Sequence, residues 1–369
     1  MRFPGFEGEW ESCELGEIAE FSKGAGISKD QRSSDGNPCI LYGELYTTYL
    51  TEIIDEVVSK TNLDPTGLVR SKANDIIIPA SGETAIDIST ARCVLQDDVL
   101  LGGDLNIIRL FNQDGRFFSY QLNGVRKKDI ARIAHGVSIV HLHGNALSHI
   151  TVNYPSRSEQ EKISSLLSLI DQRIAIQNKV IEKYESLIKA LRYHIFSTIE
   201  PVKEVSFADV LSYEQPIKYI VSDTEYSDNK GLTPVLTANK AFILGYTKEV
   251  KGVYDKGPCI ILDDFTLDSK IVDFPFKVKS SAIKILSAKT TVCLRYIFEY
   301  LKFLDLNTEE HKRHYIAEIE PMTIELPDED TIQSIACLFD RIDQRRKGLE
   351  RDVQLLKTQK EYLLKALFI

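Results

Sequence analysis

Ile170-Asp171-Gln172-Arg173 is the stretch that decides the fold, because the same tetrapeptide returns as Ile342-Asp343-Gln344-Arg345. The two copies are 342 − 170 = 172 residues apart. The same offset, without a gap, carries Pro155 onto Pro327, Ile163 onto Ile335, Leu166 onto Leu338, Leu191 onto Leu363 and Phe196 onto Phe368. Such a period is too long for a solenoid unit. It indicates a duplicated module, in which each copy holds a domain followed by a helix.

Each copy has the apolar spacing of a coiled-coil seam. Apolar residues recur in alternating steps of four and three, which average 3.5 residues and keep one stripe facing a partner helix. Gln177, Arg346 and Lys360 interrupt the stripe; such polar residues lower stability but fix register and partner choice. The seam residues that we predict are Ile163, Leu167, Ile170, Ile174, Ile181 and Leu191 in the first copy and Ile335, Phe339, Ile342, Leu349, Val353 and Leu363 in the second.

Both helices have start signals. Pro155-Ser156 and Pro327-Asp328 each place a side-chain oxygen able to cap a helix after a proline, with acidic residues in the first turn. Each helix is about 40 residues, or roughly 60 Å, whereas ordinary core helices run about 8–20 residues. We therefore predict two long helices packed antiparallel on each other. The predicted limits are 1–155 for a first lobe, 156–200 for the first helix, 201–327 for a second lobe and 328–369 for the second helix.

Composition sets broad limits. The 369 residues are enough for two or three domains, and 43% hydrophobic with 27% charged residues is ordinary for a globular protein. We expect a cytoplasmic protein, because no apolar signal segment and no membrane-spanning run is found. The six cysteines are scattered singly and are predicted to be reduced, buried thiols. The net charge of −9 argues mildly against an isolated nucleic-acid binder but does not exclude one whose basic residues are clustered.

The lobes contain short apolar runs bounded by turn residues, which predict strands. The clearest runs are 75–79, 105–110, 259–262 and 281–286. Later in each lobe, Phe117–Leu122 and Val292–Leu301 predict a helix, and a final strand (150–154 or 322–326) leads to the proline before the long helix. The lobes share this frame but little side-chain sequence. Such divergence is expected if the helices set the geometry and the lobes read different targets.

The order of variable lobe, helix, variable lobe and helix resembles the DNA specificity subunit of type I restriction–modification systems. Residues 233–246, 260–270 and 274–282 fit the target-recognition domains of that family, and residues 136–142 play the comparable closing role in the first lobe. The resemblance covers essentially the whole chain. It implies an α+β fold in which two β-rich globular target-recognition domains are joined by two long antiparallel coiled-coil helices, with a pseudo-twofold internal repeat.

The same resemblance implies a function and partners. It implies a non-catalytic subunit that binds double-stranded DNA at a bipartite, gapped target, with one lobe reading each half. Two adenine methyltransferase (modification) subunits would dock on the helices, and restriction or translocase subunits would join through them. Leu166, Ile176, Leu187 and Leu355, which lie outside the seam, are predicted to help dock partner helices.

Catalytic motifs are missing from the sequence. It contains no G-x-x-x-x-G-K-[ST] phosphate loop and no Asn-Pro-Pro-aromatic tetrapeptide, which methyltransferases of the resembling systems use to hold a flipped base. We predict no catalytic residue, no cofactor and no metal site. Asp263-Asp264 with Asp268 offers oxygen ligands for Mg²⁺, but a turn that orients a recognition loop is the preferred interpretation. Glu249-Val250-Lys251, His141-x-His143 and His311-x-x-His314 are interpreted as surface residues, the histidines also as groups facing phosphates.

The predicted DNA contacts are regional. Clusters of Lys and Arg grip phosphates, while Asn, Gln and Arg reach base edges in the major groove. Lys127, Lys128 and Arg132 form one predicted basic patch, Lys277, Lys279 and Lys284 form a second, and residues 311–315 form a third. The residues that we predict at the DNA interface are Lys23, Tyr42, Tyr46, Lys127, Lys128, Arg132, Ser138, His141, Thr237, Asn239, Lys240, Lys277, Lys279, Arg313 and His314.

Two other classes of protein compete with this interpretation. A coiled-coil scaffold whose lobes bind proteins and have no DNA role suits the acidic charge; salt-sensitive DNA binding in the presence of partners would exclude it. A self-sufficient methyltransferase is disfavoured by the missing cofactor and base-clamp motifs.

Overall fold

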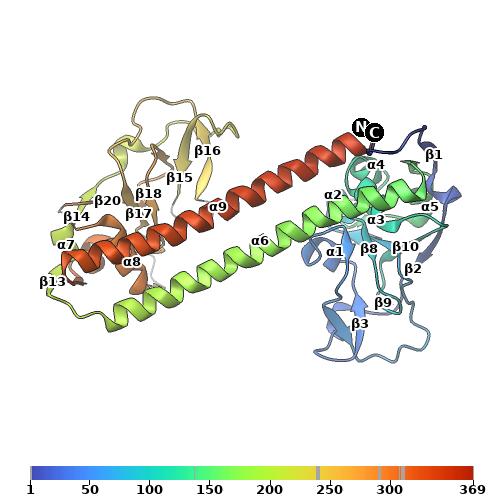
Figure 1. Cartoon of the computed structure of the whole chain (residues 1–369), viewed down its shortest axis with the longest axis horizontal. Coiled ribbons are helices and arrows are strands. Elements are labelled where there is room, and N and C mark those ends of the chain that lie inside the picture. Colours follow the sequence, from blue (N-terminus) through green and yellow to red (C-terminus); the bar gives the residue numbers. More distant parts are fainter. Residues whose placement is uncertain are drawn as a thin grey trace. The chain divides into compact units, whose positions relative to one another are not determined.

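The computed structural model describes residues 2–136, 138–237, 242–289, 292–306, 308 and 312–368. The chain forms two compact units. Unit 1 consists of Met1–Asn178 and Arg351–Ile369, and unit 2 consists of Lys179–Glu350. Each unit therefore combines one β-rich lobe with part of both long helices, which are the green and red ribbons of Figure 1.

The first lobe is built on a five-stranded sheet with the strand order β2-β10-β6-β8-β4. Neighbouring strands are antiparallel except for β4 and β8, which are parallel. The predicted strands at 75–79 and 105–110 are β6 and β10. The strands of this sheet are β2 (Ala19–Lys23), β4 (Ile53–Ile54), β6 (Asp75–Pro79), β8 (Arg92–Val94) and β10 (Leu105–Leu110).

Smaller sheets and short helices complete this lobe. A three-stranded sheet has the order β5-β3-β9, and two strand pairs join β1 to β12 and β7 to β11. These strands are β1 (Glu11–Glu14), β3 (Asn37–Ile40), β5 (Ser59–Thr61), β7 (Ser81–Gly82), β9 (Leu100–Leu101), β11 (Val140–His141) and β12 (Thr151–Tyr154). The helices are α1 (Glu44–Thr47), α2 (Ala85–Ile88), α3 (Gly115–Asn123), α4 (Lys127–Arg132) and α5 (Gly144–Ser148).

The second lobe repeats the central part of this topology. Its four-stranded sheet has the order β14-β20-β17-β18, which corresponds to β2-β10-β6-β8, and β13 pairs with β21 as β1 pairs with β12. A further sheet has the order β16-β15-β19. The elements are β13 (Lys203–Ser206), α7 (Phe207–Val210), β14 (Leu211–Glu214), β15 (Thr233–Leu236), β16 (Ile243–Thr247), β17 (Cys259–Asp263), β18 (Ser269–Val272), β19 (Lys277–Val278), β20 (Ile283–Ala288), α8 (Leu294–Phe303) and β21 (Thr323–Leu326).

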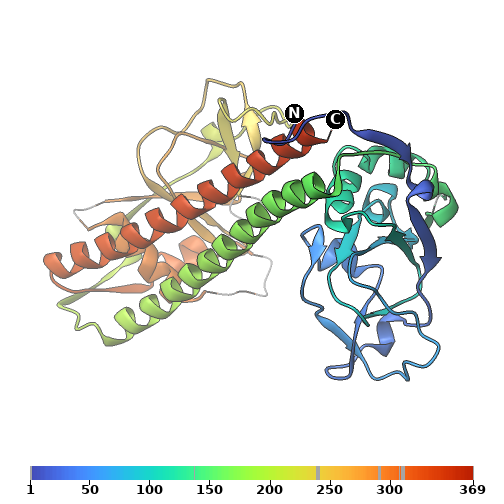
Figure 2. The same ribbon diagram turned by 45° about the vertical axis from the view of Figure 1, so that its right-hand side comes forward.

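The two long helices are α6 (Arg157–Thr198) and α9 (Glu329–Leu367). Asp328 caps α9: its Oδ2 accepts a hydrogen bond from the Thr331 hydroxyl at 2.6 Å and its Oδ1 accepts one from the backbone N–H of Thr331 at 2.9 Å. Both bonds lower the pKa of the Asp328 carboxyl. In unit 1 the beginning of α6 lies with the end of α9, and in unit 2 the end of α6 lies with the beginning of α9. The helices are therefore antiparallel, as both views show (Figure 1 and Figure 2).

The seam explains which face of each helix is covered. Six of the predicted seam residues are buried and six are half-buried; of the buried ones, Ile163 and Leu167 lie in the core of the first lobe and Ile335 and Phe339 in the core of the second. The buried ones are Ile163, Leu167, Ile170, Ile335, Phe339 and Val353. The half-buried ones are Ile174, Ile181, Leu191, Ile342, Leu349 and Leu363. The predicted α+β fold class, with its internal repeat and two long helices, is confirmed.

The repeat also governs how each helix end meets a lobe. Phe368, at the end of α9, packs against Phe117 of α3 with ring centroids 4.9 Å apart. Its repeat equivalent Phe196, at the end of α6, packs against Tyr296 and Tyr300 of α8 at 5.4 and 5.3 Å. Burying each phenylalanine side chain contributes about 1.5–3 kcal/mol. The C-terminal end of a long helix therefore packs against the core of each lobe.

One prediction about the cysteines is wrong. Cys39, Cys93 and Cys259 are buried, and burial raises the pKa of their thiols, but Cys337 on α9 is exposed. Cys337 lies one residue before Leu338, on the side of α9 away from the seam residue Phe339. No helix in the described parts of the chain combines the length and the apolar character needed to cross a membrane.

Glu214 on β14 predicts an acid-dependent loss of stability. Burial raises the pKa of its carboxyl, but hydrogen bonds from Lys218, Lys256 and Tyr219 outweigh burial and lower the pKa to about 2. Because the folded pKa lies below the unfolded value, the stabilisation is complete above about pH 4.5 and is lost as the pH falls towards 2. We expect Glu214→Gln to cost about 1 kcal/mol at pH 7, reduced by partial exposure. Urea unfolding at pH 7, 4.5 and 3 should then show a smaller loss for E214Q than for the wild type; equally steep losses would contradict the assignment.

Candidate nucleic-acid interface

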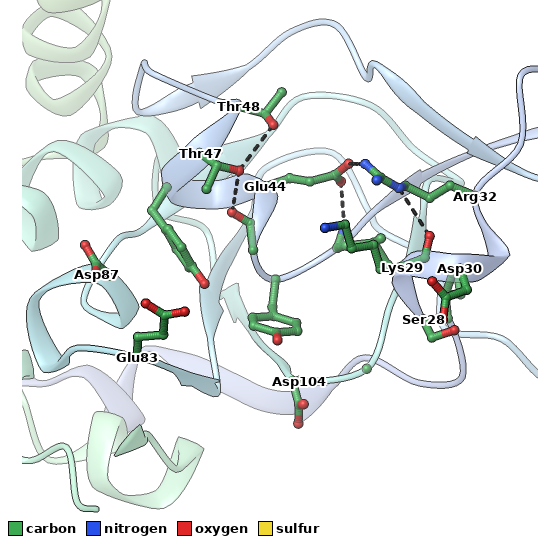
Figure 3. A pocket seen from close by; sticks show the side chains of 16 residues that line it. Ser28, Lys29, Asp30, Arg32, Glu44, Thr47, Thr48, Glu83, Asp87 and Asp104 are labelled. Atoms are coloured by element: carbon green, nitrogen blue, oxygen red, sulfur yellow. Dashed lines mark hydrogen bonds and ion pairs between the residues drawn. The ribbon is translucent and has the colours of Figure 1, made fainter. Parts of the chain in front are cut away.

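A cavity of about 730 Å³ opens in the first lobe. Figure 3 shows Ser28, Lys29, Asp30 and Arg32 on one side of it, Glu83 and Asp87 on the other, and Asp104 between the two groups at the bottom. Four segments distant in the sequence therefore build this cavity. Its lining residues are Ile27, Ser28, Lys29, Asp30, Arg32, Leu41, Tyr42, Gly43, Glu44, Tyr46, Thr47, Thr48, Glu83, Asp87, Gly103 and Asp104.

A glycine-rich turn after β2 leads into the segment that lines the cavity from Ile27 onward. Gly24 lies so close to the next strand connection that a Cβ atom there would be 2.0 Å from the carbonyl oxygen of Gly102. The backbone N–H of Ala25 donates to the carbonyl of Leu101 at 3.0 Å. Only a residue without a side chain permits this approach. The turn thereby holds the exposed Lys23 beside the segment that contributes Gly103 and Asp104 to the cavity.

The cavity is rich in carboxylates. Asp30, Glu44, Glu83, Asp87 and Asp104 line it, against two basic residues, Lys29 and Arg32. The buried Glu44 is already engaged: its Oε2 accepts from the backbone N–H of Leu41 at 2.9 Å, and its Oε1 lies 3.5 Å from Arg32 Nη1. Sequence reasoning missed the acidic lining because its residues are brought together only by the fold.

Two predicted residues, Tyr42 and Tyr46, do lie together at this cavity. Both are half-buried. Burial raises the pKa of Tyr46, and neighbouring Tyr42, Asp87 and Glu83 raise it further, so its hydroxyl stays protonated and can donate a hydrogen bond. The cavity therefore offers hydroxyl donors next to carboxylate acceptors.

The predicted basic patch on α4 is only partly solvent-facing. Lys128 and Arg132 are exposed, and Arg132 Nη1 lies 3.1 Å from Asp129 Oδ1. Lys127 is half-buried, its Nζ donates to Thr90 Oγ1 at 3.3 Å, and burial, with the nearby Arg92, lowers its pKa. Two side chains of the three therefore remain available at the surface.

The closing segment of the first lobe reaches the vicinity of the cavity. His141 on β11 pairs with Ser81 on β7, and a Cβ atom on the adjacent Gly82 would lie 3.6 Å from Tyr46 Oη. His141 and Ser138 are both exposed. The imidazole rings of His141 and His143 stack with centroids 6.5 Å apart.

In the second lobe, two predicted DNA contacts are buried instead of exposed. Lys277 is 2% exposed; its Nζ lies 2.8 Å from Glu249 Oε2 and donates to the carbonyl of Lys251 at 2.7 Å. His314 is 1% exposed, and its Nδ1 lies 2.7 Å from Glu318 Oε2. The expectation that these two side chains face DNA is corrected, because Lys277 is held in an ion pair with Glu249 and His314 in a hydrogen bond with Glu318.

The other predicted DNA contacts of the second lobe differ in their exposure to solvent. Lys279 and Arg313 are exposed. Thr237 is buried, and its backbone N–H donates to the carbonyl of Phe242 at 3.0 Å. Asn239 and Lys240 lie outside the described residues. Lys284, which was expected in a basic patch with Lys277, is also buried and lies 3.0 Å from Asp264.

The acidic turn at the end of β17 accepts hydrogen bonds from its own loop and from the distant segment around Tyr315. Asp263 Oδ1 accepts from the backbone N–H groups of Phe265 and Thr266 at 2.9 and 3.0 Å. Asp264 Oδ1 accepts from the backbone N–H of Tyr315 at 2.8 Å. Among the described residues, no group of three or more His, Cys, Asp and Glu side chains is arranged to hold a metal ion.

The long helices expose apolar side chains on their outer faces. Of the four residues predicted to dock partners, Ile176, Leu187 and Leu355 are 62%, 44% and 67% exposed, and Leu166 is half-buried. Large apolar side chains on a solvent-facing helix surface typically mark protein contacts when they are contiguous. The seam analysis did not single out three further exposed ones, Leu169, Tyr193 and Tyr362.

Two solved structures share the fold of the whole chain. The S subunit of a type I restriction–modification system from M. genitalium matches with a TM-score of 0.70 and 15% identity, over 100% of this chain and 99% of that one. A chain from a structure described as the basis of complex assembly and conformational transition of the type I R-M system matches with a TM-score of 0.55 and 13% identity, over 97% of each chain. At these identities the likeness concerns the fold alone.

Each of the sequence comparisons covers less than half of the chain. The specificity subunit of the type I restriction enzyme EcoR124I/EcoR124II of Escherichia coli is 37% identical over 174 residues, which are 44% of this chain and 43% of that protein. The chain thus matches less than half of that relative's length. Residues 7–186 also match the family model of the type I restriction modification DNA specificity domain. Residues 7–186, the first lobe with most of α6, therefore belong to the family of type I restriction modification DNA specificity domains, as the sequence pattern predicted.

Proposed function

We propose that this chain is a non-catalytic specificity subunit that binds double-stranded DNA and directs partner adenine methyltransferase and restriction subunits to a bipartite, gapped target. The observation that carries the proposal is a DNA specificity domain over residues 7–186 whose sheet order and long helix recur in the second half of the chain. The name of the E. coli relative, a specificity subunit of a restriction enzyme, supports the same role.

Each lobe is assigned one half of the target, with lobes at 1–155 and 201–327 and spacer helices at 156–200 and 328–369. The shared strand order supplies the same support for recognition loops in both lobes. The side chains on that support differ, which suits two half-sites of different sequence. The helices then act as a ruler that holds the half-sites at a set separation.

The charge of the cavity suggests how the first lobe divides its contacts. A carboxylate-rich cavity repels phosphate, whereas carboxylates accept hydrogen bonds from the amino group of cytosine in the major groove. We therefore assign base-edge contacts to the cavity beside Tyr42 and Tyr46. Phosphate contacts are assigned to exposed cations, which position the protein without reading sequence. These cations are Lys23, Lys128, Arg132, Lys279 and Arg313.

The experiment that tests the function is methylation mapping. The chain is co-expressed with the methyltransferase subunit from its own locus in a host without DNA methylation, and methyladenine is mapped across the genome. We expect one gapped, two-part motif that appears only when this chain is present. As a control, the methyltransferase subunit alone should give no such motif.

Two outcomes would contradict the proposal. A continuous motif without a gap would argue against two separate half-sites. A stable complex with the partner but no methylation would favour the alternative function, a coiled-coil scaffold with protein-binding lobes. The exposed apolar side chains of Ile176, Leu187 and Leu355 would then serve protein assembly alone.

A further inference from the structure

Lys360, one of the polar residues that interrupt the seam, joins three separate segments of unit 1. Its Nζ lies 2.6 Å from Asp171 Oδ1 on α6 and 2.6 Å from Glu52 Oε2 in the first lobe. The side chains of the three residues are only 14%, 9% and 11% exposed. One ammonium group on α9 therefore neutralises one carboxylate of the other helix and one carboxylate of the lobe.

Tyr120 on α3 completes this junction from the lobe side. Its hydroxyl donates to Asp171 Oδ2 at 2.7 Å, and its ring centre lies 5.3 Å from Lys360 Nζ. Tyr120 thus fixes the direction of the Asp171 carboxylate and of the Lys360 ammonium. Because one residue along a helix is a rise of about 1.5 Å, a slip of α9 by a single residue would break both contacts of Lys360.

At the equivalent junction between lobe and helices in unit 2, the positions of the positive and negative charges are exchanged. The repeat offset carries Ile188 onto Lys360, so the long helix there presents an apolar residue. The lobe supplies the cation instead: Arg295 on α8 lies 3.6 Å from Asp343 Oδ2, the repeat equivalent of Asp171. Glu299 on α8 forms an ion pair with Arg192 of α6, with Glu299 Oε2 2.7 Å from Arg192 Nη2.

We propose that Glu52, Asp171 and Lys360 form a charge-specific seat that positions the first lobe on the helix pair, and that this seat restricts the gap tolerated between the two DNA half-sites. The second clause rests on the proposed function. If the first lobe were placed at the equivalent position on the helices in unit 2, Glu52 would face Ile188 instead of Lys360. Its buried carboxylate would then have no partner. Buried ion pairs add little net stability over apolar replacements, but they can fix one arrangement among several, and breaking one by removing a partner is costly. Lys360 is therefore a positioning residue.

The test uses the full chain co-expressed with its methyltransferase partner and plasmids whose targets carry the wild-type gap or a gap one base pair shorter or longer. Lys360→Met leaves two buried carboxylates without their cation, so we expect its Tm to fall by about 5–10 °C. The triple variant E52Q/D171N/K360M removes all three charges. This variant should recover most of the Tm lost in K360M. It should nevertheless methylate targets whose gap is one base pair shorter or longer, so that the preference for the wild-type gap falls about 10-fold or more. Lys357→Met, at an exposed position one turn earlier on α9, is the matched control and should match the wild type in both readouts.

The outcomes separate a seat from a merely stabilising contact. A triple variant that keeps the single wild-type gap would overturn the proposal, as would a K360M variant unchanged in both Tm and gap preference. If K360M yields no soluble protein, Tyr120→Phe removes only the hydrogen bond to Asp171 and should show a smaller loss of gap discrimination. If the wild type gives no gapped motif at all, the proposed function fails, while the Tm comparison still decides whether the three charges act as one unit.

Discussion

Replacing Asp264 with alanine is expected to lower the free energy of unfolding by about 3–5 kcal/mol, because the change leaves a buried cation without its partner. Asp264 is 1% exposed, and its Oδ2 lies 3.0 Å from the Nζ of Lys284, which is itself buried. Its Oδ1 accepts from the backbone N–H groups of His314 and Tyr315 at 3.1 and 2.8 Å. The same substitution therefore also removes the acceptor of two backbone donors, 50 and 51 residues away. Urea unfolding of the purified chain measures the loss.

The matched control is Asp273→Ala, at an exposed position in the same lobe, which should change stability by no more than about 0.5 kcal/mol. Repeating both measurements with Mg²⁺ or a chelator distinguishes a turn from a metal site. We expect no dependence on either additive, because the carboxylate oxygens of Asp263 and Asp264 accept hydrogen bonds inside the lobe. A wild-type stability that rises with Mg²⁺, while that of D264A does not, would refute the structural role.

The long helices and the main strands could be predicted because their signals are local. The 3.5-residue spacing places Ile163 and Leu167 on one stripe of α6 and Phe339 on the matching stripe of α9, and only a partner helix or a lobe can cover such a stripe. The runs at 75–79 and 105–110 are mostly apolar, with Ile76, Ile77, Ile78, Ile107 and Ile108 at their centres, as in buried strands. The lobe topology could not be derived in this way, since strand order depends on contacts between segments far apart in sequence.

The predicted DNA contacts were less reliable because sequence shows a charge but not its partner. Lys277 reads as an available cation, yet Glu249 is 28 residues away in sequence and 2.8 Å away in space. The hydrogen bond from Lys277 is in turn the main cause of the lowered pKa of Glu249. The acidic cavity escaped prediction for the same reason, because Asp30, Glu83 and Asp104 come from three different segments.

Polar residues in the seam were a better guide to contacts inside the protein than surface charges were to contacts with DNA. A lysine at a seam position is unfavourable in an isolated helix pair, so Lys360 required a partner beyond its own helix. The structure supplies two, Asp171 and Glu52. Arg346 finds its partners within α9, at Asp343 and Glu350. The contacts of Lys360 connect the first lobe to both helices, whereas these contacts of Arg346 stay within α9.

Phe339→Ala is expected to destabilise the chain by about 3–5 kcal/mol, whereas Leu355→Ala should change stability by less than about 0.5 kcal/mol. Both residues are on α9, but Phe339 is fully buried in the core of unit 2 and Leu355 is 67% exposed. Truncating Phe339 removes a ring from a packed core and leaves a cavity, while truncating Leu355 removes apolar surface that is already in water. Thermal and urea unfolding of the two variants measure this contrast.

A second readout, methylation of the mapped target together with recovery of the complex with the methyltransferase subunit, should reverse the order of the two variants. At a temperature where F339A is still folded, it should retain assembly, because its side chain faces inward and offers nothing to a partner. L355A should weaken assembly, because the outer faces of the helices are assigned to partner docking. Equal effects of both variants on stability would place Leu355 in the core, against its exposure. Undiminished assembly of L355A would instead move the docking surface to another part of the helices, such as the neighbourhood of Ile176 and Leu187, without touching the assignment of the seam.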